Sequence, residues 1–313
     1  MMEFYNRKVY SEINDALRDR KEEIRVITTM NFSNLSNVFS HALQNEPIAF
    51  DVDSFEMHGL PPFVNITPNY WMERTSASIV IAKCQKRRDE IIKKCLTSNT
   101  YDTVLAVHDM IARNVRYEDC GKESHTMLGP LIDKAGVCDG FSKAFKYVLD
   151  GLGISSFVIA GEAIDPATRL SSPHAWNIVS IDGQWTHIDL TFDATISCFS
   201  TVRHDYFGLA SEDITSDHFF EEKNYPTAVN SSIDFYGKYG LTISGKKQFA
   251  LFLETLLSSG QRTGTFRAIN ITDQIDVTEK VIELTASFLV SHGISASIAV
   301  NYNPIRSVCS VQF

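Results

Sequence analysis

Apolar positions recur at helical and strand spacing near both ends of the chain. At the start, Val9, Ile13 and Leu17 fall on one helical face, and the following segments predict a strand, a second helix and two strands. The C-terminal part predicts the same order and closes with a hairpin of "ISASIAV" and "SVCSVQF" across "NYNPIR". We therefore expect an α-β-α-β-β module in residues 1–75 and another in residues 226–313. The repeated order fits a duplicated module, and it fits equally two ends that complete one sheet.

Residues 76–225 form a different block, in which we expect the chemistry. Two helices are predicted over "SASIVIAKCQKRRDEIIKKCL" and "YDTVLAVHDMIARNVRY", and strand-rich sequence runs to about Phe207 before a polar, aromatic linker, "SSIDFYGKYG". The segment "KAGVCDGFSKAF" lies after the second helix and before the strand-rich sequence, and its cysteine begins another helical pattern. The apolar residues of that pattern are Phe141, Ala144, Phe145, Val148, Leu149 and Leu152.

Cys138 is thus expected at a helix N-terminus, between two glycines. Unpaired backbone N–H groups and the positive end of the helix dipole favour a thiolate there, and the same N–H groups could bind an oxyanion. Gly136 would permit a tight turn into the helix, and Gly140 would let a strand or a substrate approach the backbone. The neighbouring carboxylate of Asp139 opposes thiolate formation. A cysteine at a helix start is, however, more often a small buried apolar residue than a nucleophile.

A base for this cysteine is offered by the segment "HAWNIVSIDGQWTHIDLTFD". Asp182-Gly183 within alternating sequence predicts a two-residue β-hairpin turn. In a regular hairpin Trp176 lies opposite Asp189, so that His174 and Asp189 become diagonal neighbours on one face. The carboxylate would then hold one imidazole nitrogen while the other takes a proton from a nucleophile.

This dyad depends on a regular hairpin, because a bulge would change the register. His187 shares the same predicted face but lies nearer the turn, which makes it the weaker candidate for the base. Trp176 could shield the dyad from water. Without Cys138, a histidine satisfied within a strand and a capping or turn role for Asp189 would be the preferred interpretation.

Charge and composition exclude several other functions. A net charge of -9 gives no general reason to bind nucleic acid, and no apolar run is long enough to span a membrane. The charged N-terminus does not resemble a signal peptide, and the six cysteines form no CxxC pair, so we expect a cytoplasmic protein with reduced thiols. The histidines are spread singly without paired ligand spacing, so neither a metal nor another cofactor is expected.

Three separated motifs resemble the transglutaminase-like superfamily, and in particular its bacterial members. They are "GVCDGF", "HAWN" and "IDGQWTHIDLTFD", flanked by "NVRYED" and "DYFGLASEDITSDH". The resemblance covers about residues 100–220. It implies an α+β fold with a papain-like core, in which the cysteine helix packs on an antiparallel sheet. It also implies Cys138 as nucleophile, His174 as general base and acid, and Asp189 as the residue that orients His174.

The resemblance also suggests residues around the cleft. Family members take a second oxyanion donor from an aromatic residue before the cysteine, for which Tyr117 is the candidate here; a core tyrosine at a helix end is the alternative. Trp176, Asp139 and Gly140 are candidates for lining the substrate cleft. The chain departs from the family pattern at Phe192 and Thr186, where tryptophan and tyrosine are frequent. It shows no acidic cluster like the calcium sites of animal transglutaminases.

The expected function is acyl transfer from a peptide, isopeptide or glutamine amide of a protein or peptide substrate. A thioester on Cys138 would pass its acyl group to water or to an amine. Hydrolysis is favoured because no lysine-binding or calcium signature is evident. A peptide N-glycanase is less favoured because it usually has a zinc-binding CxxC pair. The alternative from another class is a catalytically silent binding or scaffold protein with the same fold.

Overall fold

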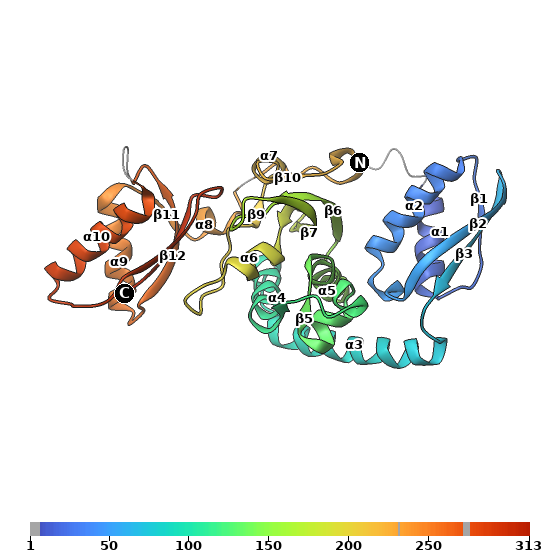
Figure 1. Ribbon diagram of the computed structural model, residues 1–313, viewed down its shortest axis with the longest axis horizontal. Helices are drawn as coiled ribbons and strands as arrows, with labels where there is room; N and C mark the ends of the chain where they lie inside the picture. Colours follow the sequence, from blue (N-terminus) through green and yellow to red (C-terminus); the bar gives the residue numbers. More distant parts are fainter. Residues whose placement is uncertain (1–6, 231, 272–275) are drawn as a thin grey trace. The chain divides into compact units, whose positions relative to one another are not determined.

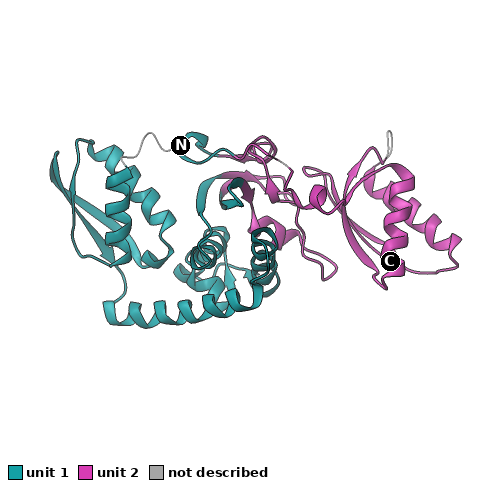
Figure 2. Cartoon of the chain, turned by 180° about the vertical axis from the view of Figure 1, so that it is seen from behind, with its two compact units in different colours: residues 1–161, 174–185, 220–227 teal, residues 162–173, 186–219, 228–313 magenta. Residues whose placement is uncertain are grey.

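The computed structural model describes residues 7–230, 232–271 and 276–313. The chain divides into two compact units, coloured separately in Figure 2. The first comprises residues 1–161, 174–185 and 220–227, and the second comprises residues 162–173, 186–219 and 228–313. The predicted division into 1–75, 76–225 and 226–313 follows the sequence pattern. The compact units are defined by contacts, and each of them contains segments of residues 76–225.

The N-terminal part of the first unit has the predicted α-β-α-β-β order (Figure 1). Its strands form an antiparallel sheet in the order β1-β3-β2. The predicted helical face is buried, with Val9, Ile13 and Leu17 in a core shared with Leu35 and Phe39 of the second helix. The elements are α1 (Arg7–Arg18), β1 (Ile24–Ile27), α2 (Phe32–Asn45), η1 (Pro47–Ala49), β2 (Val52–Leu60) and β3 (Phe63–Tyr70).

The middle of the first unit begins with the two predicted helices. The helical stripe after Cys138 is also confirmed, because Phe141, Ala144, Phe145, Val148 and Leu149 are all buried. The elements are α3 (Arg74–Cys95), α4 (Thr100–Asn114), β4 (Arg116–Tyr117), η2 (Lys122–His125), the π-helical turn η3 (Gly129–Asp133), β5 (Ala135–Gly136), α5 (Cys138–Gly151), β6 (Ser156–Ile164), β7 (Ser171–Ile181) and β8 (Gln184–Ile188), and the last three strands have residues in both units.

The predicted hairpin turn between β7 and β8 is confirmed. Asp182 and Gly183 both have positive φ, 51° and 80°, as a two-residue type I′ turn requires. The predicted length of the second strand is wrong, because β8 ends at Ile188 and the helix α6 (Leu190–Ile196) starts directly afterwards. Asp189, which was predicted to lie opposite Trp176 in the second strand, therefore lies beyond the end of β8.

After α6 the second unit contains short elements that the sequence pattern did not predict individually. β9 pairs with β8, and β10 pairs antiparallel with the end of β6 through His218 and Phe219. The elements are β9 (Phe207–Leu209), α7 (Ser211–Ile214) and β10 (His218–Phe219), followed by α8 (Phe235–Lys238) within the predicted linker, whose Ser231 lies outside the described residues.

The C-terminal part of the second unit repeats the topology of the N-terminal module. Its sheet order is β11-β12-β14-β13, in which β12-β14-β13 corresponds to β1-β3-β2. β11 is an unpredicted fourth strand, parallel to β12. Two helices contribute Phe249, Leu253 and Val281 to its core. The elements are β11 (Thr242–Ser244), α9 (Gly245–Ser258), β12 (Thr263–Ile269), α10 (Val277–Ser291), β13 (Ala299–Asn303) and β14 (Val308–Gln312).

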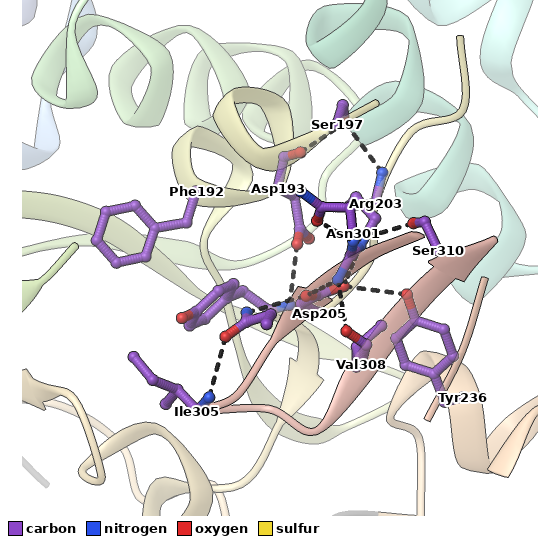
Figure 3. A network of polar contacts seen from close by, with 12 residues as sticks. Phe192, Asp193, Ser197, Arg203, Asp205, Tyr236, Asn301, Ile305, Val308 and Ser310 are labelled. Carbon is purple, nitrogen blue, oxygen red and sulfur yellow. Dashed lines mark hydrogen bonds and ion pairs between the residues drawn. The ribbon is translucent and has the colours of Figure 1, made fainter. Parts of the chain in front are cut away.

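A buried polar network fixes β13 and β14 to the segment that follows α6 (Figure 3). Arg203 forms an ion pair with Asp205, with Nη2 2.6 Å from Oδ2. The same guanidinium donates to Asn301 and Ser310, both at 2.9 Å. Because an unpaired buried charge would be costly, the network favours one position of the C-terminal strands within this unit.

Among the described residues, the helices include none with the length and apolar character that crossing a bilayer would require.

Candidate active site

Cys138 is the first residue of α5 and is partly accessible. The chain enters α5 through β5, which pairs in parallel with β4. The expected turn at Gly136 is wrong, because the left-handed residue is Lys134, with φ 57°, and Gly136 lies in the strand. Gly136 is instead required by packing, since a Cβ there would lie 2.8 Å from Cγ of Pro130. Cys138 thus starts a helix of 14 residues whose first N–H groups have no partner within the helix.

The two residues after Cys138 contact other parts of the protein. A Cβ on Gly140 would lie only 2.2 Å from the carbonyl oxygen of Ser124, so the close neighbour of Gly140 is the protein's own backbone. Asp139 pairs with Lys143, with Oδ2 2.7 Å from Nζ, and accepts a hydrogen bond from Gln44 of α2 at 2.9 Å. The expected opposition of Asp139 to a thiolate is therefore partly offset by a neighbouring cation.

Tyr117 lies beside the strand that leads to Cys138. In the register of β4 and β5 its partner is Gly136, two residues before the cysteine, and its ring centroid is 6.4 Å from that of Phe141. The side chain is 53% exposed, so the alternative interpretation of a core tyrosine is wrong. Tyr117 is thus accessible to solvent, and its role as an oxyanion donor remains a prediction.

Two hydrogen bonds hold α5 to β7 one helical turn beyond Cys138. The hydroxyl of Ser142 donates to the carbonyl of Ala175 at 3.0 Å, and the amide of Asn177 donates to the carbonyl of Ser142 at 3.0 Å. Ser142 is four residues after Cys138 and therefore lies on the same side of the helix. Ala175 directly follows His174, so the cysteine helix and the histidine strand are fixed to each other near both residues.

His174 is buried, with 7% of its surface exposed. Its ring stacks beside Trp176 at an interplanar angle of 17°, with centroids 6.1 Å apart. Trp176 is fully buried and meets Phe220 edge-on. Trp176 is therefore a core residue whose ring packs beside the His174 imidazole. The approach of the imidazole to the Cys138 thiol remains a prediction.

Asp189 lies in the second unit and is fully buried. It is the N-cap of α6, where one carboxylate oxygen accepts the backbone N–H groups of Thr191 and Phe192 at 3.0 and 3.1 Å. This is the capping role that the sequence offered as an alternative. The other oxygen faces Nε2 of His218 at 3.1 Å. Its predicted pairing with His174 joins residues of different units and remains a prediction.

His218 is the residue at this site that the sequence analysis missed. It is fully buried on β10, and its Nδ1 lies 2.7 Å from Oδ1 of Asp217. Asp189 and His218 belong to a group of buried side chains whose ligand atoms could share a metal ion. Because each imidazole nitrogen faces a carboxylate at hydrogen-bond distance, we interpret the pair as hydrogen-bonded. A ring that donates at both nitrogens has no lone pair left for a metal.

His187, the weaker candidate for the base, has a different environment from that predicted. It is fully buried on β8, and its Nε2 lies 3.2 Å from the hydroxyl of Ser211. Burial lowers the pKa of His187 to about 3, with a smaller effect in the same direction from the charges of His218 and Arg306. Such an imidazole stays neutral near pH 7 and is a poor proton acceptor.

The buried thiols are poor nucleophiles for the same reason. Burial raises the pKa of Cys84 and of Cys309 to about 12, and it also raises the pKa of Cys95. Thiolates are the reactive form of cysteine, so these residues are expected to react slowly near neutral pH. The candidates for a reactive thiol are therefore the more accessible cysteines, which are Cys120, Cys138 and Cys198.

The solved structures that resemble this chain include the following three proteins. A protein described as a TGase has 16% identity and a TM-score of 0.33, over 54% of this chain and 50% of its own. A candidate cysteine protease from Cytophaga hutchinsonii has 17% identity and a TM-score of 0.31, over 44% of this chain and 61% of its own. The periplasmic domain of TgpA from Pseudomonas aeruginosa has 17% identity and a TM-score of 0.27, over 42% of this chain and 58% of its own.

The chain thus spans between 50% and 61% of the length of these proteins. No curated protein gave a significant match. A family model, that of the transglutaminase-like superfamily, matches residues 87–190. The matched residues include Cys138, His174 and Asp189, and they run from the middle of α3 to the start of α6. Residues 87–190 therefore form a transglutaminase-like superfamily domain, as the three sequence motifs predicted.

Proposed function

We propose that the protein is a cysteine-dependent acyltransferase or hydrolase that acts on amide bonds of a protein or peptide, with water as the favoured acceptor. The observation that carries the proposal is the pair of hydrogen bonds between Ser142 and β7. They join the helix that begins at Cys138 to the strand that bears His174, inside a domain of a superfamily whose members are usually enzymes.

In the proposed reaction His174 takes the proton of the Cys138 thiol, and the resulting thiolate attacks the carbonyl carbon of the amide. A carbon–sulfur bond forms, and the carbonyl electrons move to the oxygen. The resulting oxyanion is stabilised by the backbone N–H of Cys138 and by the hydroxyl of Tyr117. His174 then gives its proton to the amide nitrogen, the carbon–nitrogen bond breaks, and an amine or ammonia leaves a thioester on Cys138.

The thioester is resolved in a second step. A water molecule attacks the carbonyl carbon while His174 takes one of its protons, and the carbon–sulfur bond breaks to release a carboxylic acid and the thiolate. Asp189 orients the imidazole and stabilises its protonated form in both steps. An amine in place of water would give a new amide. Water is favoured because the sequence carries no lysine-binding or calcium signature.

The proposal is tested with a library of glutamine-containing peptides, incubated with and without a biotin-labelled primary amine. We expect peptide cleavage or conversion of glutamine to glutamate without need for the amine, and loss of the reaction in Cys138→Ala. Mass spectrometry of Asp189→Ala, in which His174 loses its orienting residue and turnover is slowed, should find an acyl group on Cys138.

Cys120→Ala is the matched control, because Cys120 is exposed and lies outside the proposed site. It should retain the activity of the unmodified protein. Equal turnover by the Cys138→Ala variant would contradict the proposal. Incorporation of the labelled amine in preference to hydrolysis would retain the cysteine mechanism and change the acceptor.

A further inference from the structure

A line of buried charged side chains runs through the second unit from Asp189 to the C-terminal module. Nε2 of His218 lies 3.1 Å from Oδ2 of Asp189, and Nδ1 lies 2.7 Å from Oδ1 of Asp217. Arg306, in the turn between β13 and β14, forms an ion pair with that same oxygen of Asp217. Tyr206 donates its hydroxyl to the other oxygen of Asp217 at 2.8 Å.

The hydrogen-bond geometry specifies a protonation state for His218. Ionised carboxylates only accept hydrogen bonds, so His218 can bond to Asp189 and Asp217 together only if both its nitrogens carry a proton. A neutral ring would place a lone pair against one carboxylate in a site without solvent, which is unfavourable. With His218 charged, two carboxylates face two cations, His218 and Arg306, and the buried charges balance.

The same contacts leave Asp189 little freedom. Its Oδ1 is held by two backbone N–H groups at the start of α6, and its Oδ2 is held by His218. The plane of the carboxylate is therefore fixed from both oxygens. Oδ2, which faces His218, has a second lone pair that can accept a further hydrogen bond, whereas Oδ1 already accepts two.

We propose that His218 is a positioning residue, which holds the carboxylate of Asp189 in the orientation that serves the catalytic histidine. This inference rests on the proposed function, in which Asp189 orients His174. Asp217 and Arg306 fix His218 in turn, so a residue of the C-terminal module completes the support of the site.

The placement of Arg306 is itself well supported. Its guanidinium also donates to the carbonyl of Asp213, and its charge lies over the ring of Tyr206, with Cζ 4.7 Å from the ring centroid. The strands on either side of its turn are fixed by Arg203 and Asp205 (Figure 3), since Asn303 donates to Asp205 at 2.9 Å. These contacts hold Arg306 of the C-terminal module in place for its buried ion pair with Asp217.

Two similar substitutions of His218 separate positioning from simple packing. Glutamine places its amide group near the position of Nε2, which faces Asp189, whereas asparagine places it near Nδ1, which faces Asp217. If His218 positions Asp189, His218→Asn should label at Cys138 with iodoacetamide about 10-fold or more slowly than the unmodified protein, as is typical for loss of an orienting partner. His218→Gln, which keeps a donor towards Asp189, should retain clearly more of the labelling rate than His218→Asn.

The direct readout is the protonation of the His218 ring, which is measured by nitrogen NMR of the full chain at neutral pH. We expect both ring nitrogens to carry protons that are protected from exchange. A singly protonated His218 would overturn the inference whatever the labelling rates are. So would equal labelling in the asparagine and glutamine variants, or losses that only follow their melting temperatures.

Failure of the proposed function has a separate signature. If Cys138 of the unmodified protein labels no faster than the exposed Cys120, the proposed function is wrong and the positioning role is wrong with it. A protonated His218 in that case would identify the network as structural.

Discussion

At the scale of single residues, the glycines around Cys138 act through packing against the protein itself. Gly140 has the carbonyl oxygen of Ser124 where a side chain would begin, and Gly136 has the ring of Pro130. The turn into the helix is made by Lys134 in a left-handed conformation. The sequence indicated that these positions need glycine, but a substrate or a turn was an equally good reason until the neighbours were known.

We predict that Gly140→Ala destabilises the protein by about 1–3 kcal/mol, because its Cβ would overlap a backbone oxygen that cannot move alone. Gly151→Ala is the matched control in the same helix. Its nearest neighbours are atoms of the Arg88 and Ile92 side chains, which can move. Alanine there should be neutral or should stabilise by up to about 1 kcal/mol through helix propensity. Urea unfolding of both variants measures the difference, and equal free energies of unfolding would contradict the packing role of Gly140.

The candidate site could be predicted from the sequence only in part. Cys138 was found from a helical pattern and two glycines, and His174 from its place before an Asp-Gly turn. The contact between Gln44 and Asp139 joins residues 95 positions apart, and no local pattern contains that information. The same is true of His218, which follows Asp189 by 29 positions.

At the scale of helices and strands, elements with long periodic patterns were predicted well. Both terminal modules have the expected order, and Asp182-Gly183 gave the turn between β7 and β8 because two successive positive φ angles favour these residues. The sheet order of each module could not be read from the sequence, since the same alternation fits several pairings.

The end of β8 was predicted wrongly for an identifiable reason. The alternating pattern was extended through "HIDLTFD", although an aspartate before a short apolar segment is also a helix N-cap signal. The structure uses Asp189 as the cap, so β8 ends one residue earlier, at Ile188. As the cap, Asp189 lies outside β8, and its carboxylate is held by the backbone N–H groups of Thr191 and Phe192.

At the scale of the whole molecule, stability should depend on pH through buried histidines in both units. Burial lowers the pKa of His41 to about 4 and that of His187 to about 3. Above about pH 6.5 neither form of the chain binds these protons. As the pH falls from 6.5 towards 4, the unfolded chain takes up a proton on His41 that the folded protein excludes, so stability is lost.

His41→Phe should remove this contribution, which is on the order of 3 kcal/mol for a pKa depression from 6.5 to about 4. The measurement is the free energy of unfolding at pH 7 and at pH 4.5 for each variant. Tyr10→Phe is the control, since it changes a residue that contacts the His41 ring and leaves the histidine in place. Burial raises the pKa of Glu46 and Asp150 and so acts in the opposite direction. An unchanged pH dependence in His41→Phe would contradict the prediction.

The central claim is that Cys138 is an activated nucleophile. It is tested most directly by measuring the iodoacetamide labelling rate of each of the six cysteines near neutral pH by mass spectrometry. We predict that Cys138 labels faster than Cys120, although it is the less exposed of the two, and far faster than the buried thiols. The excess should disappear in His174→Ala. Labelling of Cys138 at or below the rate of Cys120, or an excess that persists without His174, would contradict the account.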